Sequence, residues 1–231
     1  MLVPIRVLAC DYDGTIATEG AVDEATTQAL NRWRASGRQL VLVTGRQLPD
    51  IQRAFPSTGT LFAWVVAENG PVLFKPATGE RRLLADPPPA AFVDRLRTQG
   101  VSPLYLGDVV VATTRENADA VLNAIEALDL RLELIFNKAS LMVLPSGVSK
   151  ATGLTAALKG MAIAPAEVAG IGDAENDAAL IGICGLGVAV ANAIPELKAR
   201  ADRVMRGEAG AGVIELIEEI LAAEPSSAPA R

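Results

Sequence analysis

Two acidic side chains follow an apolar stretch near the start of the chain. Residues 5–10 are almost all apolar, and Asp11 and Asp13 come directly after them, with Gly14 next. A continuous apolar run that ends abruptly is typical of a buried strand in a parallel sheet. Because side chains two positions apart in an extended backbone leave on the same side, we expect both carboxylates to lie together. Their mutual repulsion favours a divalent cation, whereas an Asx turn, the alternative, would need only one aspartate.

A second candidate site follows the apolar residues 40–43. Thr44, Gly45 and Arg46 come next, and a hydroxyl beside a glycine can offer O–H and backbone N–H groups to a phosphate. An N-cap followed by a packing glycine uses the same residues, so both interpretations stay open. Lys150 opens a later predicted helix. A lysine there is usually only solvated, but opposite a phosphate site it would offset the negative charge of substrate and aspartates.

A dense polar group follows the apolar run 168–172. Asp173, Asn176 and Asp177 lie in the turn after it. An N-cap would explain Asp173 but not the other two residues. A shared Mg²⁺ explains all three, because this ion accepts carboxylates, keeps several waters and bridges to substrate phosphate. The sequence therefore predicts a metal and phosphate site at the carboxyl edge of a parallel sheet, where open α/β sheets bind their ligands.

Composition excludes several other kinds of site. The 231 residues include no histidine, which rules out Ser-His-Asp and Cys-His catalysis, a histidine base and H-E-x-x-H zinc chemistry. The net charge of −6 and the lack of a basic stripe argue against nucleic acid as a partner. Neither a signal peptide nor an apolar stretch of membrane-spanning length is recognisable, so we expect a cytoplasmic protein with no membrane partner. Cys10 and Cys184 lie in apolar runs and are expected to be buried free thiols.

Strands and helices alternate through most of the chain, as in a doubly wound α/β fold with a parallel sheet. The predicted core strands are residues 5–10, 38–43, 61–67, 168–172 and 187–191, with a short returning strand at 72–74. The predicted core helices are residues 22–34, 48–54, 151–159, 176–181, 194–201 and 213–223.

Prolines and glycines after residue 75 mark a change of pattern. The segment that follows contains predicted helices at 90–99 and 117–128 and predicted strands at 109–113, 131–136 and 141–144. We therefore expect a Rossmann-like core of residues 1–78 and 146–223, a small inserted α+β domain of residues 79–145 with a largely antiparallel sheet, and a frayed tail at 224–231.

Taken in order, the motifs resemble those of a known family. Four segments look like the ordered motifs of the haloacid dehalogenase superfamily: Asp11-Tyr-Asp13-Gly-Thr15, Val43-Thr44-Gly45-Arg46, Lys150 and Gly172-Asp173-Ala-Glu-Asn176-Asp177. The insert between the second and third motifs resembles the class IIB cap of the superfamily's sugar-phosphate and phosphoglycolate phosphatases. Glu68-Asn69-Gly70 also resembles a segment common in that subgroup.

The resemblance implies a Mg²⁺-dependent phosphatase that forms an aspartyl-phosphate. Asp11 would be the nucleophile, and Asp13 would be the general acid and then the base. The implied Mg²⁺ ligands are the carboxylates of Asp11, Asp173 and Asp177 and the backbone carbonyl of Asp13. The residues implied to bind the phosphoryl group are Thr44, Gly45, Arg46, Lys150 and Asn176, of which Thr44 and Lys150 are also expected to be catalytic.

The insert is implied to close over the site as a cap. It would recognise the leaving group of a small phosphorylated metabolite, either a sugar phosphate or a phosphoglycolate-like acid. Arg115, Asn137 and Lys138 are the candidate contacts, although exposed hairpin positions would explain them as well. A phosphomutase of the same superfamily is the alternative within the enzyme class, and a receiver-like module phosphorylated on aspartate is the alternative outside it. The chain could act as a monomer or a homodimer.

Overall fold

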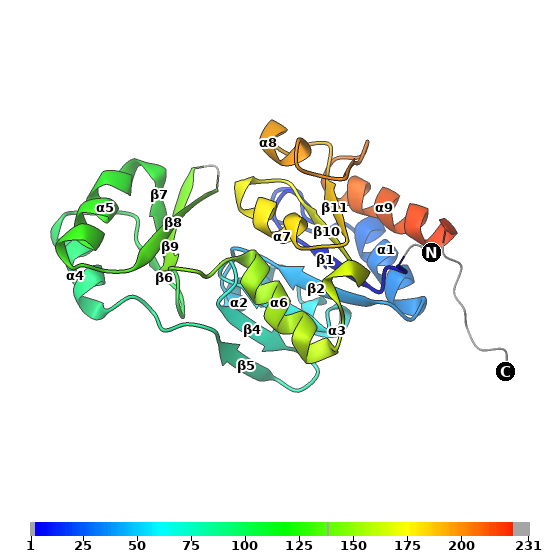
Figure 1. Ribbon diagram of the computed structural model, residues 1–231, viewed down its shortest axis with the longest axis horizontal. Helices are drawn as coiled ribbons and strands as arrows, with labels where there is room; N and C mark the ends of the chain where they lie inside the picture. Colours follow the sequence, from blue (N-terminus) through cyan, green and yellow to red (C-terminus); the bar gives the residue numbers. More distant parts are fainter. Residues whose placement is uncertain (1–2, 138, 224–231) are drawn as a thin grey trace.

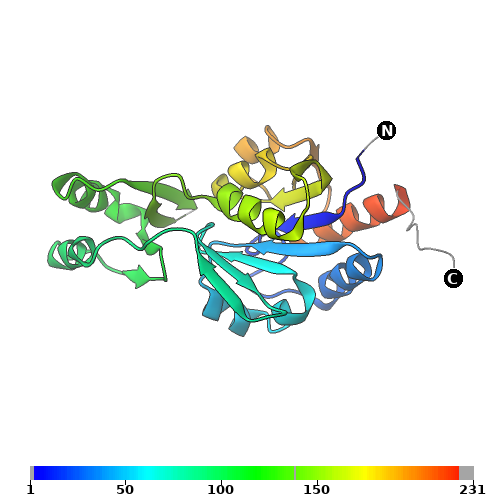
Figure 2. The ribbon, with the colours of Figure 1, turned by 60° about the horizontal axis from the view of Figure 1, so that its bottom comes forward.

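The computed structural model describes residues 3–137 and 139–223. Within these ranges the strands form an eight-stranded sheet and a separate four-stranded sheet. Helices cover the larger sheet, and the smaller sheet extends with its own helices from one end of this core, away from α9 (Ala209–Ala223), as Figures 1 and 2 show. The expected tail at 224–231 and one candidate insert residue, Lys138, lie outside the described residues.

The strand that precedes Asp11, β1 (Val7–Cys10), lies in the middle of the larger sheet. The strand order is β12-β11-β10-β1-β2-β3-β4-β5, parallel from β12 to β3 and antiparallel from β3 to β5. The bounds of the other strands are β2 (Gln39–Val43), β3 (Trp64–Ala67), β4 (Val72–Lys75), β5 (Glu80–Leu83), β10 (Val168–Gly172), β11 (Leu186–Ala189) and β12 (Arg203–Val204).

Both faces of the central strands are buried, which explains their unbroken apolar sequence. Leu8 and Cys10 belong to the core cluster on one face, and Val7 and Ala9 belong to the cluster on the other. The helices with side chains in the first cluster are α1 (Glu24–Ala35), α2 (Leu48–Ala54), α3 (Thr58–Leu61), α8 (Pro195–Lys198) and α9, and Ile181 of α7 (Ala178–Gly182) also belongs to it. On the second face lie α6 (Lys150–Met161) and α7, which contact each other.

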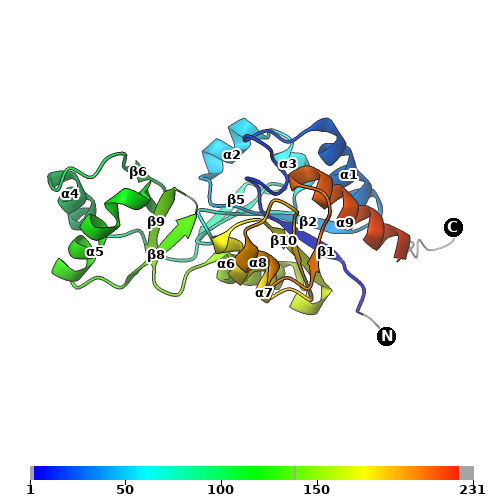
Figure 3. The same ribbon diagram turned by 90° about the horizontal axis from the view of Figure 1, so that it is seen from above.

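The insert is an antiparallel sheet with two helices on one face, seen from above in Figure 3. The strand order is β6-β7-β9-β8. Its elements are α4 (Ala90–Thr98), β6 (Tyr105–Leu106), β7 (Val111–Thr114), α5 (Ala118–Ala127), β8 (Leu132–Asn137) and β9 (Ser140–Pro145). Three short 3₁₀ helices also lie in the described ranges: η1 (Arg115–Asn117), η2 (Pro165–Glu167) and η3 (Glu175–Asp177). Met142 and Leu144 face away from α4 and α5 and pack with Val148, where the chain returns to the core.

The predicted fold class is confirmed, with a parallel α/β core and an inserted, largely antiparallel α+β unit. The predicted strand at 61–67 starts late, because α3 takes Leu61 and β3 begins at Trp64. The strands β5, β6 and β12 were not expected. Two of them have only two residues, and every residue of β5 is exposed, so none has a readable apolar pattern.

One segment lies differently from its expected place. β5 falls within the 79–145 range expected for the insert, yet it extends the edge of the larger sheet beside β4. Across the described ranges, no helix has the length and hydropathy that a membrane crossing needs.

Candidate active site

The carboxyl ends of four neighbouring strands meet at one edge of the larger sheet. The strands β10, β1, β2 and β3 are parallel neighbours, so the loops after them emerge side by side. The first residues after these strands are Asp173, Asp11, Thr44 and Glu68. The sheet therefore gathers polar residues that are up to 162 positions apart in the sequence (173 − 11).

Asp11, Asp173 and Asp177 form a buried acidic cluster at this edge. One carboxylate oxygen of each lies within 4.8 Å of the other two, and none of the three residues is more than 5% exposed. The Thr15 hydroxyl lies between two of them, 3.4 Å from Asp11 Oδ2 and 3.4 Å from Asp173 Oδ1. Gly14 permits this approach, because a Cβ there would lie 2.4 Å from Asp173 Oδ2 and its φ of 82° is left-handed. The structure thus brings together the distant aspartates that the sequence pattern pointed to.

The ammonium of Lys150 lies inside this acidic cluster. Its Nζ donates to Asp11 Oδ1 and to Asp177 Oδ1, both at 2.6 Å. Ser149 fixes the start of the helix, since its hydroxyl caps α6 by accepting the N–H of Thr152. Burial by itself would lower the pKa of Lys150, but the two carboxylates and their hydrogen bonds raise it above its ordinary value. The lysine is therefore a fixed positive charge.

The cluster still carries an excess of negative charge. Burial and then the charge of Asp177 raise the pKa of Asp11 to about 7, although Lys150 acts in the opposite direction. The charge of Asp173 adds to the increase. A hard cation would remove this excess, and carboxylate oxygens are the ligands that such cations take in proteins. The donor set therefore fits a divalent metal.

The loop after β10 is held by its own side chains and by the turn that contains Asn69. Asp177 Oδ2 accepts the N–H groups of Asp173 and Ala174, each at 3.0 Å. Asn176 Nδ2 donates to Asn69 Oδ1 at 2.8 Å. Asn176 Oδ1 is buried and has no hydrogen-bond partner among the described residues. That oxygen remains available for a ligand of the site.

Thr44 and Gly45 lie in the loop between the acidic cluster and the turn that contains Asn69. Thr44 is buried, and its Oγ1 accepts the N–H of Arg46 at 3.1 Å, which leaves the hydroxyl hydrogen free to donate. A Cβ on Gly45 would lie 3.3 Å from Asn69 Nδ2, so a larger residue would press on that side chain. The small residue keeps the backbone of this loop open to a bound group.

Arg46, which was expected at the phosphate, contacts Asp13, the expected general acid. Its Nε and Nη2 donate to the two oxygens of Asp13 at 2.7 and 2.6 Å. The guanidinium lies over the ring of Tyr12, 4.8 Å from its centre. The hydrogen bond to Asp13 raises the pKa of Arg46. This two-point contact fixes the direction of the Asp13 carboxylate, whose side chain is 44% exposed.

A cavity of about 630 Å³ lies between the insert and the core. Its polar lining residues are Asn69, Arg115, Ser149, Lys150, Glu175, Asn176 and Arg200. Its apolar wall comes from β8 of the insert and from the start of α7. The cavity therefore connects the lysine of the acidic cluster with the insert, which is the arrangement a leaving-group pocket needs.

The three insert residues expected to contact substrate differ in their positions relative to the cavity and in whether the structure describes them. Arg115 lines the cavity, with its guanidinium 4.5 Å from the centre of the Phe136 ring and 3.7 Å from Glu175 Oε1. Asn137 ends β8, and its Oδ1 is buried with no partner among the described residues. Lys138 is not among the described residues.

Sequence reasoning assigned no role to several polar residues of this region. Thr15 and Glu175 lie inside two of the quoted motifs, and Arg200 has no distinctive spacing that marks it. Glu68 and Asn69 do have a signal, because they end a predicted strand just as Asp11, Thr44 and Asp173 do. The Glu68-Asn69-Gly70 segment was noted only for its resemblance to a family segment, and the rule that ligands bind at the carboxyl edge of the sheet, applied to this third strand as well, would have placed it at the site.

Comparison with known proteins shows the family of the chain. The family model for haloacid dehalogenase-like hydrolases matches residues 8–93 and 106–217. A phosphoglycolate phosphatase of Haloarcula marismortui is 33% identical over 220 residues, which cover 91% of this chain and 95% of that protein. A phosphoglycolate phosphatase of Methanothermobacter thermautotrophicus is 31% identical over 226 residues, covering 94% and 99% respectively.

A solved structure shares the whole fold, insert included. It is described as a sugar phosphatase of haloacid dehalogenase subclass IIB and matches with a TM-score of 0.76 at 19% identity, covering 93% of this chain and 98% of its own. The expected resemblance to the superfamily and to its class IIB architecture is confirmed. The chain therefore belongs to the haloacid dehalogenase-like hydrolases, as a phosphoric monoester hydrolase.

Proposed function

We propose that the protein is a Mg²⁺-dependent phosphatase that hydrolyses a small phosphorylated metabolite through an aspartyl-phosphate on Asp11. The observation that carries this proposal is the convergence of Asp11, Asp173, Asp177 and Lys150 in one buried cluster. Burying three carboxylates so close together costs free energy, and clusters of this kind are typical of functional sites. A metal and phosphate site would explain why these residues are kept together. The family membership of the chain supports the same chemistry.

The proposed Mg²⁺ ligands are the carboxylates of Asp11 and Asp173 and the backbone carbonyl of Asp13, with Asp177 binding directly or through water. Bound there, the ion would supply positive charge between the nucleophile and the phosphoryl oxygens. Asp177 already uses its oxygens on Lys150 and on two backbone N–H groups. A contact through water suits it best for that reason.

In the first step, Asp11 attacks phosphorus, so an Asp11 Oδ–P bond forms while the bond from phosphorus to the leaving oxygen breaks. Asp13 gives its proton to that oxygen. In the second step, the Asp13 carboxylate takes a proton from the attacking water, which releases phosphate and regenerates Asp11. Thr44, the Gly45 N–H and Lys150 bind the phosphoryl oxygens, with Asn176 in support. Arg46 acts by orienting Asp13, as its two hydrogen bonds support.

The leaving group is proposed to occupy the cavity between core and insert. Arg115 and Arg200 both line it together with Lys150, so a small leaving group that carries a second anion would find cationic partners. Glu175 partly offsets the positive charge of the cavity, because it pairs with Arg115. A phosphoglycolate-like acid is therefore our first candidate, which agrees with the names of the two relatives, and a sugar phosphate is the second. We also propose that the protein acts in the cytoplasm, which its two free cysteines support.

The test is hydrolysis of p-nitrophenyl phosphate and of a panel of phosphorylated sugars and acids, with and without Mg²⁺. We expect activity that requires Mg²⁺ and is lost in Asp11→Asn, because an amide is not a nucleophile. Asp94→Asn, whose side chain is exposed on α4 of the insert and pairs with Arg97, serves as the matched control and should keep full activity. Full activity in Asp11→Asn would overturn the proposal. Transfer of phosphate to a second sugar hydroxyl in preference to water would indicate a phosphomutase.

A further inference from the structure

The turn that follows β3 has an unusual backbone. Glu68, Asn69 and Gly70 have φ values of 56°, 61° and 131°, so three successive residues lie in the left-handed region. Two of them carry side chains, for which this conformation is unfavourable. Such a turn persists only where its surroundings hold it, and those surroundings connect the insert with the catalytic loops.

The carboxylate of Glu68 is fully buried and binds the insert. Its Oε1 accepts the N–H of Asp108, and its Oε2 accepts the N–H groups of Val109 and Val110, all at 2.9 Å. These three amides form the turn between β6 and β7. Glu68 makes no ion pair with a described residue, so the backbone amides themselves stabilise the buried charge.

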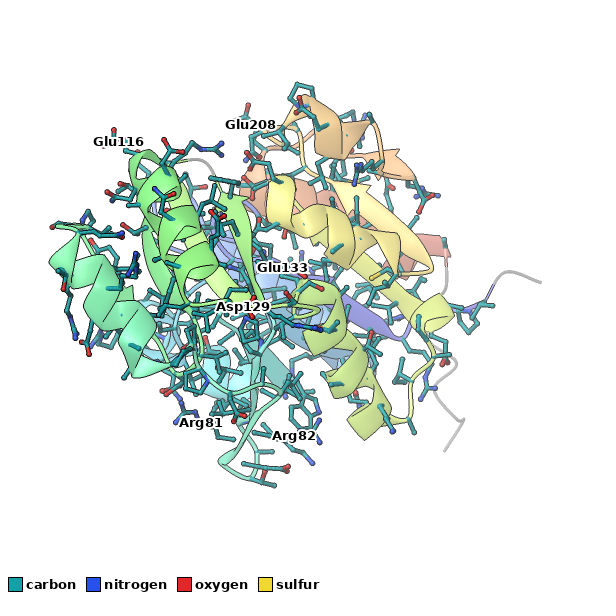
Figure 4. The ribbon with its side chains drawn as sticks, turned by 60° about the vertical axis from the view of Figure 1, so that its left-hand side comes forward. Arg81, Arg82, Glu116, Asp129, Glu133 and Glu208 are labelled. Atoms are coloured by element: carbon teal, nitrogen blue, oxygen red, sulfur yellow. The ribbon has the colours of Figure 1, made fainter. Side chains whose placement is uncertain are left out.

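Neighbouring contacts show that this turn of the insert is built around the carboxylate. A Cβ on Gly107 would lie 2.5 Å from Glu68 Oε2, so a larger residue there would have to displace the carboxylate. Gln47 Nε2 donates to the carbonyl of Leu106 at 3.1 Å, and Arg81 pairs with Asp108. Arg81, labelled in Figure 4, belongs to β5 of the larger sheet, so this pair joins the core to the insert.

The same Glu68–Gly70 turn also holds the catalytic loops. The N–H of Glu68 donates to the carbonyl of Arg46 at 3.0 Å, and the N–H of Asn69 donates to the carbonyl of Thr44 at 2.9 Å. The Asn69 side chain accepts from Asn176 and donates to Met142 of β9. A Cβ on Gly70 would lie 2.1 Å from the carbonyl oxygen of Ser149, so the turn also lies against the start of α6.

We propose that Glu68 is a positioning residue that fixes the insert to the catalytic edge of the core, so that the wall of the leaving-group cavity stays in place during turnover. The charge of its carboxylate is what holds the β6–β7 turn, because each of its oxygens accepts from backbone donors and an amide could accept with only one atom. The insert is therefore anchored on this side, and it does not swing freely as a lid.

The first test is hydrogen exchange at the amides of Asp108, Val109 and Val110 in the full-length Glu68→Gln protein. The glutamine NH₂ would face a backbone donor, so at least one amide loses its acceptor. We expect exchange at these amides to become about ten- to hundredfold faster, in keeping with the loss of hydrogen bonds to a charged group. Glu133→Gln is the matched control, because Glu133 (labelled in Figure 4) also accepts a backbone N–H, that of Gly147, but is exposed. Unchanged exchange in a folded Glu68→Gln protein would overturn the anchor.

The second variant, Gly107→Ala, tests the contact of the Glu68 carboxylate by a substitution in the insert. Gly107→Ala should displace the carboxylate and speed exchange at the same three amides, while Gly59→Ala should not, because a Cβ on Gly59 meets nothing within 4 Å. If Glu68→Gln fails to fold, Gly107→Ala decides the question, and normal exchange in that variant refutes the anchor. These measurements need no substrate, so they stand apart from the test of the proposed function.

Kinetics separate positioning from a purely structural role. In Glu68→Gln and Gly107→Ala we expect the KM for the best substrate of the panel to rise about five- to tenfold, with kcat within about twofold, because the cavity wall loosens while the catalytic cluster stays intact. Restored exchange protection in Glu68→Asp, with a KM nearer that of the wild type, would support the requirement for charge. Faster exchange with an unchanged KM would overturn the positioning role.

Discussion

At the scale of single residues, the contact between Asp13 and Arg46 has the most direct consequence for catalysis. An acid that protonates a leaving oxygen must point at it, and a flexible aspartate on an exposed turn would sample many directions. Two hydrogen bonds to one guanidinium restrict the carboxylate, and the Tyr12 ring beneath the guanidinium restricts it further. We therefore propose that Arg46 supports proton transfer by Asp13.

Arg46→Lys tests this assignment, because lysine keeps the charge and loses the planar two-point contact. We expect kcat to fall about tenfold for alkyl phosphates, whose leaving group needs a proton, and to fall much less for p-nitrophenyl phosphate, whose leaving group does not. Arg53→Lys, which alters an exposed arginine paired with Asp50 on α2, is the control and should match the wild type on both substrates. An equal loss on both substrates would assign Arg46 to the phosphate instead.

At the scale of elements, the N-cap of α1 shows how a single residue determines where a core helix begins. Asp23 was the expected N-cap, and its Oδ1 accepts the N–H of Thr26 at 2.6 Å. This backbone hydrogen bond lowers the pKa of Asp23. Asp23→Ala should therefore cost about 1 kcal/mol of unfolding free energy at neutral pH, as measured by urea denaturation.

The pH dependence of that loss follows from the direction of the shift. A lowered folded-state pKa stabilises the fold above the unfolded value, about 3.9, and this contribution disappears as the pH falls through the folded value. The difference between wild type and Asp23→Ala should hence shrink below about pH 4. Asp23→Asn also caps without titrating, so its difference from Asp23→Ala should be nearly constant with pH. A wild-type advantage that persists undiminished in acid would contradict the capping account.

Elements with strong apolar periodicity were predictable from the sequence. The predicted strand at 168–172 agrees with β10, and the predicted helix at 48–54 agrees with α2. The sequence could also place Asp11, Thr44 and Asp173 at one edge, since strand ends in a parallel sheet share an edge. It could not show that Arg46 turns to Asp13, because that depends on the direction of a long side chain. Exposed β5 also escaped prediction, because edge pairing leaves no apolar pattern.

At the scale of the whole molecule, stability should depend on the metal. The buried cluster of Asp11, Asp173 and Asp177 is strained by repulsion, so a cation that binds the folded state only will stabilise it. At Mg²⁺ concentrations about a hundredfold above Kd, we expect Tm to rise by about 5 °C or more, and EDTA should reverse the rise.

Asp173→Asn is the informative variant for this measurement. It removes one charge from the cluster while its amide oxygen can still accept from Thr15. The metal-free variant should be at least as stable as the metal-free wild type, and its Tm should hardly respond to Mg²⁺. Asp94→Asn, on the exposed face of α4 in the insert, should respond as the wild type does. An undiminished Mg²⁺ response in Asp173→Asn would place the cation elsewhere.

The central claim is that Asp11 captures phosphorus, and acid-quenched single turnover followed by peptide mass spectrometry tests it most directly. With Mg²⁺ and a preferred substrate, we expect one added phosphoryl group on the peptide that contains Asp11 and none in Asp11→Asn. A phosphoryl group mapped to any other side chain, or turnover in Asp11→Asn, would contradict the account.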